Sequence, residues 1–142
     1  MRVSLPSQPE LGLMLNMMPG GRRDEGLLAR VAQSDADASP DEMLRVTKLR
    51  SGTRSINGVA GEEALERVRE FNLATTYGFL WKSEGVADDP YQPFLSPELR
   101  SGRNPSSGGR PLDSSLHGDA VLALWDTISS TICLRQPADR AA

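Results

Sequence analysis

The sequence predicts an α+β fold, an antiparallel sheet of about five strands with two amphipathic helices packed on one face. Two observations support this fold class. Several segments alternate apolar and polar residues with the period of two that a half-buried strand requires. Two other segments place apolar residues at helical spacing. The length of 142 residues suits a single domain, 1–142, with one hydrophobic core.

Three segments have clear strand character. Apolar residues alternate along Leu11–Met17. Between Phe71 and Trp81, aromatic and β-branched side chains occupy odd positions, which predicts a central strand whose apolar face forms much of the core. A further strand is predicted at Phe94–Arg100, where Pro97 indicates an edge position or a bulge because proline cannot donate to a sheet ladder.

The middle of the chain is less distinctive. Met43–Arg50 resembles an edge strand, and a turn at Ser51-Gly52 leads to Thr53–Val59 as its hairpin partner. Gly61–Phe71 leaves two alternatives open. Spacing and propensity favour a helix, whereas its place between two strands would let it extend either of them.

Two helices are expected. The first opens at Asp24 and ends before a polar linker at 34–40. The second runs from about Leu116 to Ile132, with Ser114 or Ser115 as its N-cap. Its apolar stripe consists of Val121, Leu124, Trp125, Ile128 and Ile132. The segment 101–115 is predicted to be a mobile loop rich in Gly, Ser and Pro, and residues 137–142 a frayed tail.

Composition excludes several classes of protein. The net charge of −3 lacks the basic footprint of a nucleic-acid binder. No run approaches the roughly 18 apolar residues that cross a bilayer, so no membrane insertion is expected. The start of the chain does not resemble a signal peptide, which suggests a cytoplasmic protein or a chain without its true N-terminus. With a single cysteine, Cys133, no internal disulfide can form.

One cluster of residue types suggests catalysis. Ser114, Ser115 and His117 hold the nucleophile and base of a serine hydrolase, and Cys133 could be a thiol nucleophile paired with His117. The alternative interpretation is a helix N-terminus and a packed thiol, and it is favoured because no strand–turn–helix nucleophile motif surrounds either serine. A single histidine argues against a histidine-based metal site, so neither a metal nor another cofactor is expected.

The pair Glu62-Glu63 could act as general acid and base, but adjacent carboxylates point apart and are more often a solvated acidic patch. Beside that patch lies a basic strip of Arg45, Lys48, Arg50 and Arg54. Such a mixed-charge surface can steer a protein partner. Gly58 and Gly61 are predicted to act through the backbone, by positive φ or by a close approach. Trp81 and Trp125 are predicted to be buried in one core.

An ordered series of motifs runs from about Arg45 to Arg135. It begins with Leu49-Arg50-Ser51-Gly52-x-Arg54-x-Ile56-x-Gly58-x-x-Gly61-Glu62-Glu63 and continues with Phe79-Leu80-Trp81, a strand from Pro93, and Trp125-Asp126. This series resembles the C-terminal domain of immunity proteins that neutralise type VI secretion lipase effectors. Lys82 and Cys133 depart from the family pattern, which has an acidic residue and an arginine there.

The resemblance implies a non-enzymatic protein that binds a cognate phospholipase effector, with no small-molecule ligand, and it implies a periplasmic location. It assigns no contact residues. The Glu62-Glu63 turn and the segment 101–115 are the surfaces predicted to bind the effector, because loops on a rigid scaffold commonly carry recognition. The alternative function is a small hydrolase or thiol enzyme that uses the Ser114/Ser115–His117–Cys133 region.

Overall fold

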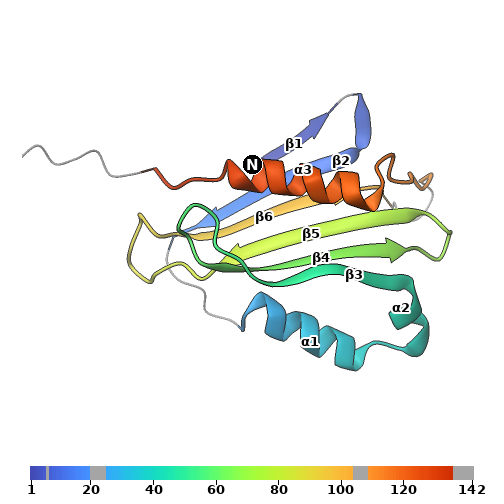
Figure 1. Cartoon of the computed structure of the whole chain (residues 1–142), viewed down its shortest axis with the longest axis horizontal. Coiled ribbons are helices and arrows are strands. Elements are labelled where there is room, and N and C mark those ends of the chain that lie inside the picture. The colour runs from blue at the N-terminus through green and yellow to red at the C-terminus, as the bar shows by residue number, and fades with distance from the viewer. Residues whose placement is uncertain (6, 20–24, 104–108, 136–142) are drawn as a thin grey trace, which may run out of the picture.

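The computed structural model describes residues 1–5, 7–19, 25–103 and 109–135. These residues form an antiparallel six-stranded sheet in the order β1-β2-β6-β5-β4-β3, together with three helices (Figure 1). The elements are β1 (Arg2–Leu5), β2 (Gln8–Met18), α1 (Leu27–Asp37), α2 (Pro40–Arg45), β3 (Val46–Thr53), β4 (Gly61–Arg69), β5 (Thr75–Ser83), β6 (Phe94–Ser101) and α3 (Gly118–Ser130). The predicted α+β class with an antiparallel sheet is confirmed.

The segment that fitted both helix and strand is a strand. β4 pairs along its length with β3 on one side and with β5 on the other. It therefore satisfies its backbone groups through the sheet, and this tertiary pairing overrides the local helix propensity of Glu, Ala and Leu. β2 and β6 lie where the sequence predicts strands. Pro97 directly precedes Glu98, the first residue of β6 that pairs with β5, so its missing N–H interrupts no ladder bond with β5. β6 itself lies between β2 and β5, so it is not an edge strand.

The central strand starts later than predicted. β5 begins at Thr75, and Phe71 and Leu73 lie in the turn before it with exposures of 72% and 66%. The prediction that Phe71 begins the core face of this strand is wrong. The side-chain oxygen of Asn72 accepts a hydrogen bond from the amide of Ala74 and ends the alternation, because it fixes a tight turn.

The region before β3 also differs from the prediction. Residues 34–40 are not a linker, since α1 continues to Asp37 and α2 begins at Pro40. Ser39 and Glu42 form a reciprocal capping box that starts α2, so Met43–Arg45 are helical rather than part of an edge strand. The predicted start of the first helix at Asp24 and the tail 137–142 lie outside the described residues.

The predicted hairpin through Ser51-Gly52 is wrong as well. β3 runs through both residues to Thr53. The chain reverses instead at Asn57-Gly58, where both residues have positive φ, 46° and 81°, and Ile56 bridges Val59. This two-residue turn matches the twist of the strands on either side. At the other helix, His117 rather than Ser114 or Ser115 is the N-cap of α3, and no side chain caps it.

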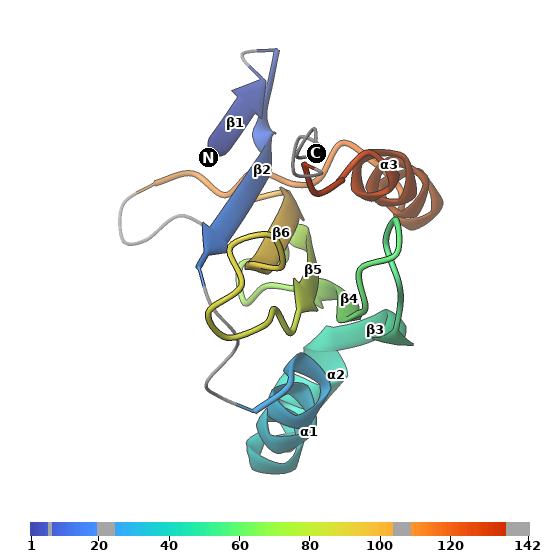
Figure 2. The ribbon, with the colours of Figure 1, turned by 90° about the vertical axis from the view of Figure 1, so that its left-hand side faces the viewer.

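The helices lie on opposite faces of the sheet, not on one face as predicted (Figure 2). Successive β4 side chains point to opposite sides. Glu63 accepts a hydrogen bond from the indole of Trp125 in α3, whereas Glu62 accepts one from the backbone amide of Leu28 in α1. The α3 face holds the core, in which Phe79, Trp81 and Trp125 are each 0% exposed. The prediction that both tryptophans share one core is confirmed.

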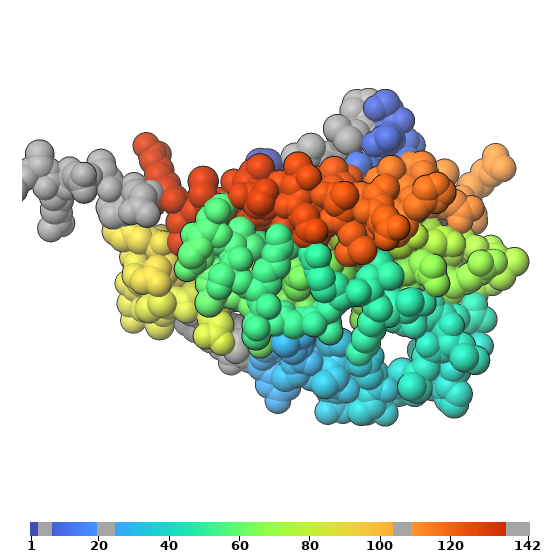
Figure 3. Space-filling view, viewed as in Figure 1, coloured from blue at the N-terminus to red at the C-terminus, as the bar shows by residue number. Residues whose placement is uncertain are grey.

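The face that carries α1 is more open. Leu27 is the one buried residue of α1. A gap of about 740 Å³ lies between α1, α2 and the first half of β3, and openings through the molecule are visible there (Figure 3). The rest of this face lies over β2, β6 and β5. Gly12 and Gly78 lie on it, and a Cβ added at either glycine would have no heavy atom within 4 Å. One face of the sheet is therefore a sealed core, and the other is a partly covered surface.

Candidate functional site

The residues of the motif series meet in one ion-pair cluster, which we call the Glu63 network: Arg50, Arg54, Glu63, Trp125 and Asp126. The Glu63 carboxylate is almost completely buried. It accepts hydrogen bonds from Arg50 Nε at 2.6 Å, Arg54 Nη1 at 3.0 Å and Trp125 Nε1 at 3.2 Å. Three donors thus satisfy one buried charge, which is the condition under which burial of a carboxylate is tolerated.

The second carboxylate of the network comes from α3. Asp126 accepts hydrogen bonds from both terminal nitrogens of Arg50, at 3.2 and 2.5 Å, and lies 3.5 Å from Arg54. The bidentate bond from Arg50 holds the pKa of Asp126 below its usual value, and the same pair raises the pKa of Arg50. β3, β4 and α3 are therefore tied together by charge as well as by apolar packing.

The glycines of the motif series serve the same region. Gly58 lies in the tight turn with φ of 81°. Gly61 has ordinary φ, but a Cβ built there would lie 2.4 Å from the ring of Trp81. The indole of Trp81 donates to the backbone oxygen of Arg54 at 2.9 Å. Both glycines act through the backbone as predicted, one by positive φ and the other by close approach.

These contacts correct the prediction of a charged recognition surface. Glu62-Glu63 is not a solvated acidic patch, because Glu63 is buried and Glu62 accepts a hydrogen bond from the amide of Leu28 in α1. The basic strip is also engaged within the chain: Arg50 and Arg54 bind Glu63, Lys48 pairs with Asp35, and Arg45 pairs with Asp41. The motif series builds the scaffold.

The structure does not assemble the residues of the hydrolase alternative. Ser114 bonds to Ser101 at 2.6 Å, and Ser115 donates to Glu10 at 2.5 Å. His117 and Cys133 lie beyond opposite ends of α3, whose 13 residues span about 20 Å. Cys133 is exposed, so the expectation of a packed thiol is wrong. Among the described residues, no group of three or more His, Cys, Asp or Glu could hold a metal.

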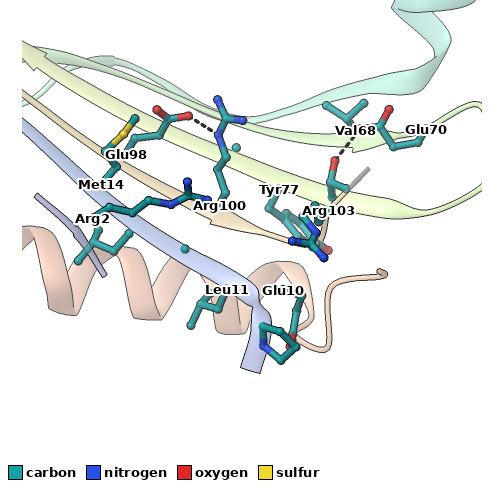
Figure 4. A pocket seen from close by; sticks show the side chains of 16 residues that line it. Arg2, Glu10, Leu11, Met14, Val68, Glu70, Tyr77, Glu98, Arg100 and Arg103 are labelled. Atoms are coloured by element: carbon teal, nitrogen blue, oxygen red, sulfur yellow. Dashed lines mark hydrogen bonds and ion pairs between the residues drawn. The ribbon is translucent and has the colours of Figure 1, made fainter. Parts of the chain in front are cut away.

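A groove of about 500 Å³ lies on the open face of the sheet (Figure 4). Arg100 on β6 pairs in register with Gly12 on β2 and with Gly78 on β5. Because glycine has no side chain, the surface is recessed on both sides of Arg100. Arg100 bonds to Glu98, and Arg2 and Arg103 also line the groove. The lining is mixed in charge and contains no nucleophile paired with a base, so its chemistry is that of binding.

The sequence profile described as the Tle cognate immunity protein 4 C-terminal domain matches residues 1–137. The chain belongs to this family. The resemblance inferred from the motif series is confirmed, and the match extends to the first forty residues. No curated protein matches the sequence.

Three solved structures share the fold of this Tle cognate immunity protein 4 C-terminal domain. A chain in the crystal structure of the Tle4–Tli4 complex has a TM-score of 0.76 and 25% identity, over 94% of this chain and 44% of that chain. The immunity protein TplEi of the type VI secretion system from Pseudomonas aeruginosa, complexed with an "L" peptide, has a TM-score of 0.76 and 24% identity, over 94% and 46%. Apo TplEi has a TM-score of 0.72 and 23% identity, over 93% of this chain and 42% of that chain. The chain therefore spans less than half the length of these structures.

Two surfaces of this family member were missed by sequence reasoning. The groove depends on the register of Gly12, Arg100 and Gly78 across three strands, which no local pattern reveals. The exposed Phe71 and Leu73 were assigned to the core because their odd positions continue the alternation of β5. Asn72 between them was the signal for a turn.

Proposed function

We propose that this chain is an immunity protein that binds a type VI secretion phospholipase effector and neutralises it by occlusion, without catalysis of its own. The observation that carries the proposal is the family match over residues 1–137. The relative in the Tle4–Tli4 complex supports it, because that protein of the same fold is seen bound to another protein. A phospholipase that attacks membrane lipid from the periplasm requires its inhibitor there, and we propose that location for this chain.

The placement of charged and nucleophilic residues supports a binding function. Arg50, Arg54, Glu63 and Asp126 of the motif series are used within the Glu63 network, and Glu62 accepts a hydrogen bond from the Leu28 amide. Ser114, Ser115, His117 and Cys133 are directed to separate partners or separate ends of α3. Within the described part of the chain, no helix is long and apolar enough to cross a bilayer. We propose that residues 1–142 act as one domain that presents a rigid surface to the effector.

The segment 101–115 stays a predicted recognition loop. Residues 104–108 lie outside the described part of the chain. The flanking residues are anchored: Arg103 bridges Leu112, and Thr75 donates to the Asp113 side chain at 2.7 Å. A loop with fixed ends on a rigid sheet is a common support for recognition.

The test mixes the purified chain with the Tle4-type lipase from the same genome and follows phospholipid hydrolysis. Loss of lipase activity that is complete near one chain per lipase supports the proposal, and undiminished activity in the presence of folded chain contradicts it. Ester hydrolysis by the chain alone, compared with the His117→Ala variant, tests the enzyme alternative. Activity that disappears in that variant would favour the enzyme.

A further inference from the structure

We propose that the effector docks on one end of the molecule, a surface formed by α2 and by the β4–β5 turn. The distal surface, as we call it, consists of Leu44, Phe71 and Leu73, with Arg45 packed on the Phe71 ring and with Arg67, Arg69 and Arg103 at the adjoining ends of β4 and β6. Its partner is an apolar depression on the effector with carboxylates at its rim. The proposal rests on the proposed function, and it adds where the effector binds and through which chemistry.

Three large apolar side chains project into solvent at this end. Leu44 is 87% exposed, Phe71 72% and Leu73 66%. They come from two segments that touch, because the guanidinium of Arg45 lies 4.1 Å from the centre of the Phe71 ring and donates to the backbone oxygen of Glu70. Single exposed apolar residues are common, but a group held together on a rigid end is typical of a binding surface.

The turn that presents Phe71 and Leu73 is held in a strained conformation. Leu73 has φ of 69°, a left-handed value that a branched side chain adopts at a cost of about 1 kcal/mol or more. Hydrogen bonds fix this geometry: Glu70 N donates to Ala74 O at 2.9 Å, and Leu73 N donates to Glu70 O at 2.9 Å. A glycine or asparagine at position 73 would relieve the strain, so stability does not explain the leucine.

Neighbouring segments brace the same turn. The amide of Thr75 donates to the side chain of Asp113, and the amide of Ser114 donates to the backbone oxygen of Thr75 at 2.9 Å. The predicted recognition segment 101–115 is thereby attached to the base of the turn. A preorganised surface loses little conformational entropy when it binds, which favours affinity.

The charges at this end indicate the chemistry of the partner. Arg67 and Arg69 are exposed on β4, and Arg69 pairs in register with Thr75 at the base of the turn. Arg103 follows Gly102, whose backbone lies against Thr75. Among the described residues, no ion pair involves these three arginines. The carboxylates near this end are engaged within the chain: Asp41 pairs with Arg45, Glu42 forms the capping box of α2, and Glu70 accepts a hydrogen bond from Thr76. The three arginines are therefore available to carboxylates on a partner.

A protein fits this surface better than a membrane does. α2 has six residues, too few for an amphipathic helix that lies in a bilayer interface. A rigid turn with an aromatic anchor and neighbouring arginines has the composition of an interface hot spot.

The experiment compares two double variants of the full chain for binding to the Tle4-type lipase by calorimetry. Phe71→Ser with Leu73→Asn removes the apolar group, and asparagine tolerates the left-handed backbone at position 73. Val86→Ser with Tyr91→Ser is the matched control, because these side chains are 43% and 56% exposed in the β5–β6 loop, at the opposite end of β5 from the β4–β5 turn (Figure 1). Thermal unfolding of both variants checks that the fold is retained.

We expect the Phe71/Leu73 variant to bind the lipase roughly 30-fold more weakly or worse, as for loss of a hot spot, and the control to bind like the wild type. If the wild type binds and the Phe71/Leu73 variant binds equally, the docking proposal is wrong and the immunity function stands. If the wild type itself neither binds nor inhibits the lipase, the proposed function is wrong.

Two further measurements on the chain alone test whether the distal surface binds a membrane or a second copy of the chain instead of the effector. The first is sedimentation with vesicles of phosphatidylglycerol and phosphatidylethanolamine, and the second is molecular mass in solution. The proposal expects no vesicle binding and no self-association that depends on Phe71 and Leu73. Vesicle binding lost in the variant would assign the surface to the membrane, and a dimer lost in the variant would assign it to a second copy of the chain. Either result overturns the proposal.

Discussion

The two faces of the sheet differ in how they are held together. On the α3 face, Trp81, Trp125 and Phe79 are fully buried and the Glu63 network ties β3, β4 and α3 together. On the α1 face, contact depends on Leu27, on the bond from the Leu28 amide to Glu62, and on exposed pairs such as Lys48 with Asp35. The motif series that identifies the family lies on the first face. The residues that identify the family therefore stabilise the fold, and we expect the residues that bind the effector to lie outside the motif series.

The largest contrast is expected between a buried residue of α3 and a half-buried residue of α1. Trp125→Ala removes a fully buried indole that packs edge-on against Phe79 and bonds to Glu63, so we expect the free energy of unfolding to fall by about 3–5 kcal/mol. Val31→Ala, in half-buried α1, should lower it by less than about 1.5 kcal/mol. Chemical denaturation measures both. A small effect of Trp125→Ala would place the α3 stripe at a partner interface instead of in the core.

Two glycines on β4 and β5 sharpen the comparison. Gly61→Ala places a methyl group 2.4 Å from the Trp81 ring, and the overpacking should destabilise the fold by about 1–3 kcal/mol. Gly78→Ala is the matched control, because its Cβ would meet nothing within 4 Å on the open face. We expect that control to be neutral or slightly stabilising in thermal unfolding. Equal thermal-unfolding midpoints for the two variants would show that the Trp81 side chain can shift to accept the methyl group and that the α3 face is not tightly packed.

The ion pair of Asp126 should make stability depend on pH. Its pKa is lowered in the folded state by the bond from Arg50, so its stabilising contribution is present above the unfolded value of about 4 and is lost as pH falls through the lower folded value. Because the side chain is 46% exposed, Asp126→Asn should cost less than about 1 kcal/mol at pH 7. The measurement is urea denaturation at several pH values. The deficit of the variant should shrink in acid, and a constant deficit would argue against the ionic origin.

The smallest effect is expected at Glu66, which lines the gap beneath α1. Burial raises the pKa of Glu66, so its charged form is disfavoured in the folded state and wild-type stability declines as pH rises through that folded value. Glu66→Gln should stabilise the chain at pH 7 by less than about 1 kcal/mol, and the gain should vanish below about pH 4. A loss of stability at pH 7 would mean that attraction to Lys48 outweighs desolvation.

Sequence reasoning recovered the α3 face better than the rest of the molecule. The alternation at Phe79 and Trp81 and the stripe at Val121 and Trp125 are local patterns, and they correctly predicted the core. The Glu63 network could not be read in this way, because its partners Arg50 and Asp126 are separated by 76 residues and meet only through the fold. In the sequence, the buried carboxylate of Glu63 next to the half-buried one of Glu62 cannot be distinguished from an acidic patch, because the strand register is not known.

The α1 face and the distal surface were predicted less well. Ser39 and Glu42 carried a capping-box pattern that identifies the start of α2, but the apolar residues after it suggested a strand. Phe71 and Leu73 continued a strand period beyond its structural end. In both cases, apolar residues that the fold leaves exposed were assigned to strands, because hydrophobic patterning assumes that apolar residues face a core. Residues that break this assumption are the ones proposed to bind the effector.

The division between scaffold and recognition surface can be tested in one measurement, amide hydrogen exchange of the chain with and without the Tle4-type lipase. We expect lipase binding to slow amide exchange in α2, in the β4–β5 turn at residues 70–74 and in residues 109–115, and to leave exchange in the turn at residues 54–60 unchanged. Protection centred on residues 54–60, with unchanged exchange at 70–74, would contradict this division. That result would return recognition to the motif series and assign the exposed Phe71 and Leu73 no part in binding.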